Sequence, residues 1–108
     1  MPQNLTDEQE LKLLEEKIKF AEHNGQSIDK YILREIEILQ NAIDIFVVQA
    51  RQRDNLDEFD IAEIEIRQYA TMRQLAQKIG LSVDEYDAKI KAIKIRLFGE
   101  ENYKNLFE

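Results

Sequence analysis

Apolar residues recur at helical spacing through most of this chain, and no segment alternates apolar and polar residues as a half-buried strand would. The β-branched-rich run 45–48 is short and lies inside a longer 3.6-residue rhythm. Pro2, the single proline, precedes every such segment and therefore interrupts none of them. The sequence predicts an all-α fold in one domain, residues 1–108.

Residues that commonly cap helices mark the expected boundaries. The starts are predicted at Thr6, Ser27, Asp57 and Ser82. A Gln or Glu three residues after Thr6 and Ser82 gives both the spacing of a capping box. Glycines at 25, 80 and 99 predict the ends. The helices are therefore expected at about 7–23, 28–53, 58–79 and 83–98, with a polar turn at 54–57 and a short fifth helix at 100–107.

The width of the apolar faces divides these helices into two kinds. The first and fourth carry narrow apolar stripes, whereas the faces of 28–53 and 58–79 cover roughly 200° of the helix circumference, against about 100° for a one-sided helix. A helix that is apolar on two sides must have neighbours on two sides. The sequence thus predicts a four-helix antiparallel bundle with 28–53 and 58–79 inside.

Helix length indicates an elongated shape. A helix over 28–53 would be roughly 39 Å long, whereas a compact domain of this size has a diameter of roughly 34 Å. The bundle is therefore expected to be elongated and self-associating, as a homodimer paired along the second or third helix.

Some apolar residues fall outside the inward stripes. Leu13 and Phe20 lie seven residues apart on the back of the first helix, and Val48 lies on the polar side of the second, beside Ile45. Scattered apolar residues are common on protein surfaces. The alternative hypothesis is a partner-binding patch, formed by Leu13 and Phe20 or by Val48 and Ile45.

Composition excludes several classes of function. The chain has no cysteine, so disulfides, zinc–thiolate sites and cysteine nucleophiles are excluded. Its net charge of −7 argues against general binding of nucleic-acid backbones. No apolar run could cross a membrane, and the polar, acidic start is unlike a secretion signal. We therefore expect a cytoplasmic protein.

Residues with catalytic chemistry are few. Ser27 and Ser82 are expected to cap helices, and His23 to lie at a helix C-terminus, where a protonated imidazole is favourable. Asp57, Asp60 and Glu63 are the best-spaced candidate metal ligands. Acidic residues are common in a first helical turn, however, and this stripe is expected to face solvent, away from any pocket. The sequence predicts no enzyme activity, no metal and no cofactor.

Residues 75–82 resemble the first helix and turn of a helix-turn-helix, with the small residue Ala76 and a glycine at the turn. The next helix, however, would present Asp84, Glu85 and Asp87 to DNA, which phosphates would repel.

We therefore expect a small acidic protein–protein interaction module: an adaptor, inhibitor or regulatory subunit. The alternatives are a dimeric helix-turn-helix-like transcription regulator using residues 72–95, and an acidic surface that mimics nucleic acid.

Overall fold

The computed structural model describes residues 5–52 and 56–108, in which helices joined by short turns are the regular secondary structure. In these two ranges there is no strand, so the all-α prediction is confirmed, including the short fifth helix. Predicted and observed boundaries differ by at most one residue wherever both are described. The predicted end of the second helix at 53 and part of the predicted turn at 54–57 lie outside the described residues. The helices are α1 (Asp7–His23), α2 (Asp29–Gln52), α3 (Glu58–Lys78), α4 (Asp84–Phe98) and α5 (Glu100–Phe107).

Two of the predicted N-terminal caps are confirmed. The Thr6 hydroxyl accepts a hydrogen bond from the Gln9 backbone N–H at 3.1 Å, and the Gln9 side chain accepts one from the Thr6 N–H at 3.0 Å. Asp57 caps α3 by accepting from the Asp60 N–H at 2.8 Å. Each bond satisfies a backbone donor that has no partner inside the helix.

The predicted capping box at Ser82 and Glu85 is wrong. Val83 occupies the cap position of α4 without a side-chain cap bond, and the Ser82 hydroxyl accepts from the Asp84 N–H at 3.3 Å. Ser27 makes the same short-range bond to the Asp29 N–H at 3.4 Å. Both serines form local turns two residues before the first helical residue, which is a common alternative to a cap.

Glycine ends α1 and α3 as predicted. Gly25 has φ 68° and Gly80 has φ 78°, a backbone region that residues with a Cβ rarely adopt. The chain reversal lets the Gln26 N–H donate to the Ala21 carbonyl at 2.8 Å, and the Leu81 N–H donate to the Ala76 carbonyl at 2.9 Å. These bonds satisfy carbonyls that the helix leaves open.

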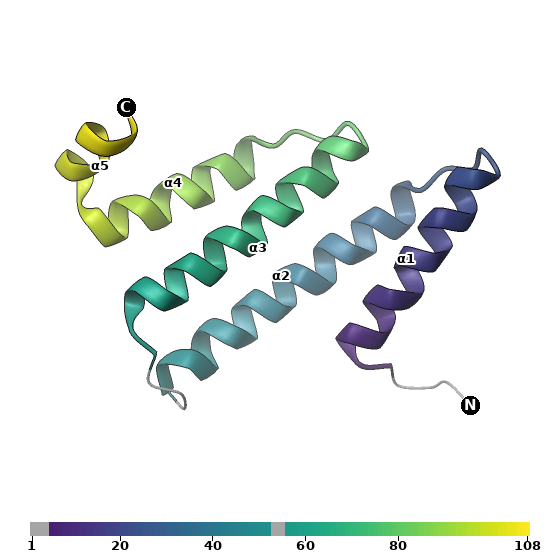
Figure 1. Ribbon diagram of the computed structural model, residues 1–108, viewed down its shortest axis with the longest axis horizontal. Coiled ribbons are helices and arrows are strands. Elements are labelled where there is room, and N and C mark those ends of the chain that lie inside the picture. Colours follow the sequence, from purple (N-terminus) through teal and green to yellow (C-terminus); the bar gives the residue numbers. More distant parts are fainter. Residues whose placement is uncertain (1–4, 53–55) are drawn as a thin grey trace.

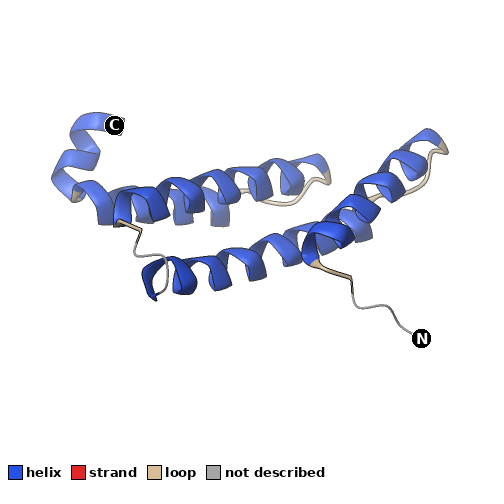
Figure 2. Ribbon diagram, turned by 60° about the horizontal axis from the view of Figure 1, so that its bottom comes forward, coloured by secondary structure: helices blue, strands red, loops and turns tan. Residues whose placement is uncertain are grey.

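The four long helices lie side by side, each antiparallel to the next (Figure 1). Cα atoms approach closely only between helices that are consecutive in the chain, so α1 and α4 form the two edges. The helices make an open, stepped layer rather than a closed bundle (Figure 2), with extents of 49 × 34 × 15 Å and a radius of gyration of 16.5 Å. This confirms the predicted elongation.

The core follows the predicted division into inner and outer helices. Its main cluster joins α2, α3 and α4, and α3 supplies most of it. The buried members are Ile43, Ala62, Tyr69, Met72, Ala76, Tyr86 and Ile93. At the edge of the layer, α1 buries only Leu14, Ile18 and Ala21. Helices α2 and α3 therefore have neighbours on both sides.

Candidate interaction surfaces

The four residues that the sequence suggests as a partner-binding patch are all solvent-exposed. The exposed fractions are 44% for Leu13, 66% for Phe20, 55% for Ile45 and 53% for Val48. Leu13 and Phe20 lie two turns apart on α1, whereas Ile45 and Val48 lie in the C-terminal half of α2. The two pairs are thus candidate surfaces on different helices.

Phe20 lies beside a shallow groove between α1 and the start of α2. Glu16, Lys17, Phe20 and Tyr31 line this groove, whose volume is about 360 Å³. The ammonium groups of Lys17 and Lys30 lie 6.0 and 5.0 Å from the centre of the Tyr31 ring. Phe20 is therefore an apolar protrusion among charged groups.

A cluster of aromatic rings gathers where α3, α4 and α5 meet. Phe59 and Phe98 pack edge to face with ring centres 6.4 Å apart. Phe107 lies 5.9 Å from Phe98 and 5.2 Å from Tyr103. The apolar pattern of 58–79 did not predict this cluster: Phe59 is an apolar residue of that helix, yet its side chain is 56% exposed. No local signal could connect rings from three separate helices.

Beside these rings is a groove, which we call the aromatic groove. It has a volume of about 180 Å³ and is lined by Phe59, Glu63, Ile66, Lys94, Leu97 and Phe98. Apolar side chains make up most of its wall, and the Lys94 ammonium lies 4.4 Å from the centre of the Phe107 ring. A groove of this composition suits an apolar side chain with a carboxylate nearby.

The C-terminal half of α4, which borders this groove, is the most basic part of the chain. Residues 89–98 contain four basic and no acidic residues. Lys89 pairs with Glu85 at 3.3 Å and Lys91 with Glu108 at 3.5 Å. Of the four cations, only Lys94 forms no ion pair with a carboxylate of the described residues.

A third groove lies among α1, α2 and α3. Its volume is about 290 Å³, and Ile18, Ile32 and Leu75 are its apolar members. Glu35 is half-buried in it, and this burial, together with the neighbouring Glu15 charge, raises the pKa of Glu35. Lys78 pairs with Glu22 at 3.2 Å across the groove. Charged groups thus surround a small apolar floor.

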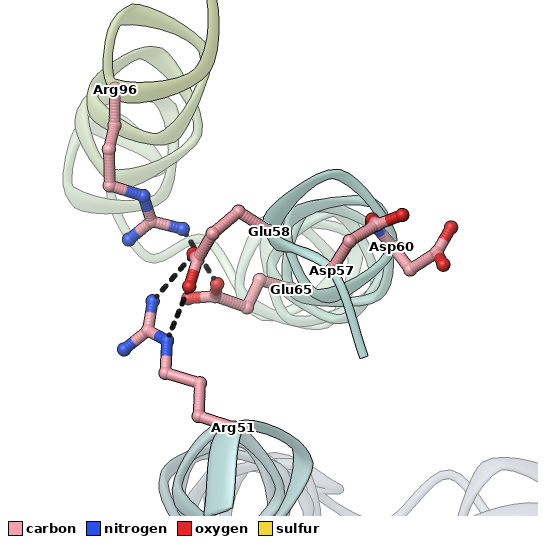
Figure 3. Close-up of polar contacts among 6 residues, drawn as sticks. All are labelled: Arg51, Asp57, Glu58, Asp60, Glu65 and Arg96. Carbon is pink, nitrogen blue, oxygen red and sulfur yellow. Dashed lines mark hydrogen bonds and ion pairs between the residues drawn. The ribbon is translucent and has the colours of Figure 1, made fainter. Parts of the chain in front are cut away.

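Two ion pairs join α2, α3 and α4 near one end of the layer (Figure 3). Arg51 donates to both oxygens of Glu58, at 2.9 and 3.0 Å, and these bonds lower the pKa of Glu58. Arg96 donates to Glu65 at 3.0 Å. The Glu65 residue is only 7% exposed, so this contact supplies a buried carboxylate with its counter-charge.

The candidate metal ligands do not gather into a site. Asp57 caps α3, and Asp57 and Asp60 point away from the ion pairs (Figure 3). Glu63 pairs with Arg67 at 3.1 Å. The expectation that this stripe faces away from any pocket is wrong for Glu63, because the side chain lines the aromatic groove. In residues 5–52 and 56–108, no three His, Asp or Glu residues are close enough together to hold a metal ion.

Helices α3 and α4 form an antiparallel hairpin. Arg73 and Asp87 pair at 2.7 Å near the turn, and Phe59 and Phe98 meet at the far end. The two helices of a helix-turn-helix cross instead at about 90–120°. The geometry therefore adds no support to the hypothesis of DNA recognition by residues 72–95.

Comparison with known proteins finds no matching family model, no matching curated protein and no matching solved structure. In the part of the chain that the structure describes, no helix has both the length and the apolar character needed to cross a membrane.

Proposed function

We propose that this protein is a small acidic protein-interaction module that acts by binding, without catalysis, and that one of its partners is a second copy of itself. The observation that carries the proposal is the size of its surface. The chain exposes 7767 Å², whereas a compact monomer of its mass exposes about 6,300 Å². The excess is well above the roughly 800 Å² that each partner buries in a standard protein interface.

The open layer explains this excess. Most domains bury their helices between at least two packed layers, but each helix here packs mainly against its neighbours in the chain. Large apolar side chains consequently remain exposed on α1, α2 and α3. A second copy of the chain would cover some of these exposed side chains. It is also a partner that is present wherever the protein itself is made.

The biological role that suits such a module is that of a cytoplasmic adaptor, inhibitor or regulatory subunit. Its net charge of −7 keeps the remaining surface soluble and favours protein partners over nucleic acid. The self-association surface includes either the α1 patch, Leu13 and Phe20, or the α2 patch, Ile45 and Val48.

Light scattering on a sizing column, over a dilution series, tests the proposal. We expect the mass to rise from 12.8 kDa at low concentration to at least twice that value at high concentration. Phe20→Glu and Val48→Glu show which patch is used, because a buried unpaired charge at a contact is strongly unfavourable. Leu33→Glu is the control, since Leu33 is 50% exposed on α2 but belongs to neither patch. A constant mass of 12.8 kDa would overturn self-association.

A further inference from the structure

We infer that two copies associate head to tail, with Phe20 on α1 of one copy entering the aromatic groove of the other. This inference rests on the proposed self-association and names the two surfaces that meet. The inserted surface, which we call the α1 strip, consists of the α1 patch (Leu13 and Phe20) together with Glu16, which lies between them in the chain.

The position of the two surfaces in the layer permits this contact. Helix α1 forms one edge, and α4 with α5 forms the other (Figure 1). The aromatic groove lies between α3 and α4, and α2 separates it from α1. One chain therefore cannot place its own α1 strip in its own aromatic groove, but two chains can bring these surfaces together. Such a contact uses two different surfaces and is heterologous.

The size of the aromatic groove matches a single large side chain. Its volume of about 180 Å³ is smaller than the roughly 300–1,000 Å³ of pockets that bind drug-sized molecules. Phe20 is 66% exposed, more than any other large apolar side chain of the described residues. In the groove its ring would meet those of Phe59 and Phe98, and interface energy is commonly concentrated in such aromatic anchors.

Charge selects this pairing over a symmetric contact between two α1 strips. Residues 7–23 carry a net charge of −3, so two of these helices would repel each other. Three of the four positive charges of residues 89–98 are paired with carboxylates, and so is Glu63 in the groove wall, which pairs with Arg67 at 3.1 Å. Lys94 lies at the groove without a carboxylate partner among the described residues. Glu16 lies between Leu13 and Phe20 in the chain. Its carboxylate forms only a long, exposed pair with Lys19 at 3.8 Å, so it can also complement this ammonium group.

A mixing experiment with two variants tests the inference. Phe20→Glu disables the α1 strip and leaves the aromatic groove intact, whereas Phe59→Glu does the reverse. We expect each variant alone to be monomeric at concentrations where the unmodified chain associates. An equimolar mixture should form a 1:1 dimer of about twice 12.8 kDa, because one intact contact remains possible. Leu33→Glu should associate like the unmodified chain.

The experiment needs a folding control and a replacement variant. Circular dichroism and thermal melting establish that both variants are folded, as expected for substitutions of exposed side chains. If Phe59→Glu does not fold, Lys94→Glu replaces it and should weaken association about tenfold or more, because it puts a negative charge where the positive charge faced Glu16.

The outcomes separate this inference from the proposed function. If the unmodified chain associates but the groove variant associates equally well, the inference is overturned and self-association stands. A mixture that remains monomeric would also overturn it. A monomeric unmodified chain would instead refute self-association itself.

Discussion

Three glutamates show how differently the surroundings in this layer act on the same type of side chain. Glu10 accepts hydrogen bonds from Arg34, which lower its pKa. Glu65 is buried and paired with Arg96. Glu35 is half-buried, and its pKa is raised by burial and by the negative charge of Glu15, with only a partial offset from Lys78. Ionised Glu10 therefore stabilises the folded chain, whereas ionised Glu35 destabilises it.

The sign of the Glu35 shift predicts a pH-dependent gain from its replacement. A raised pKa means that the folded state holds the proton more tightly than the unfolded state, so stability falls as pH rises through the raised value. Glu35→Gln should raise the melting temperature at pH 7. The corresponding increase in the free energy of unfolding should be about 0.5 kcal/mol or less. At pH 3.5 the gain should vanish, because both chains are then neutral at this position.

Thermal melting at the two pH values checks this prediction. Glu101→Gln is the matched control, because Glu101 is an exposed carboxylate on α5. An equal gain at pH 7 and pH 3.5 would show that ionisation of Glu35 is not the cause.

At the scale of the elements, α3 is the helix on which the layer depends. It packs against α2 on one side and α4 on the other, and its side chains form most of the main core cluster. Near its N-terminal end the ion pair of Glu58 ties it to α2, and that of Glu65 ties it to α4. Apolar packing and two ion pairs therefore hold α3 in register with its neighbours.

Loss of the Arg96 guanidinium should destabilise the α3–α4 pair. Arg96→Ala leaves the buried carboxylate of Glu65 without its hydrogen-bond donor, which costs about 1.5–3 kcal/mol. Arg67→Ala is the control, because it breaks the exposed pair with Glu63, and such pairs contribute about 0–1 kcal/mol. Urea unfolding followed by circular dichroism measures both. Equal losses would mean that burial of Glu65 does not strengthen its ion pair.

The whole molecule owes its shape to the way in which its apolar faces are covered. The wide apolar faces of α2 and α3 pack against each other and against α1 and α4 in the same layer, and not against a second layer. The result is a radius of gyration of 16.5 Å, against about 13 Å for a compact chain of this length. Exposed apolar residues on α1, α2 and α3 follow from this arrangement.

This open shape should persist in a chain that cannot associate. The double variant Phe20→Glu, Phe59→Glu changes one exposed residue on α1 and one on α3, so we expect it to be monomeric and still extended. Small-angle X-ray scattering should give a radius of gyration near 16.5 Å. A value near 13 Å would show that an isolated chain folds back into a closed bundle.

Local sequence patterns were enough to predict the helical class, the helices of the described residues, nearly all the boundaries of these helices, and which of them lie inside. These features depend on local chemistry: the Thr6 box, the Asp57 cap and the glycine reversals involve residues a few positions apart. Apolar periodicity also correctly predicted that Leu13, Phe20 and Val48 lie outside the buried stripes. The Ser82 box failed because a competing bond over two residues is equally local.

The open arrangement of the helices, and the position of Phe59 beside Phe98 in an aromatic groove, depend on tertiary contacts that local patterns do not predict. The contact of Glu65 with Arg96 has the same origin. Each depends on the crossing of helices far apart in the sequence, and on how far each helix extends past its neighbour. Helical periodicity shows which side of a helix is apolar, but it does not show whether a neighbour, a second copy or solvent will meet that side.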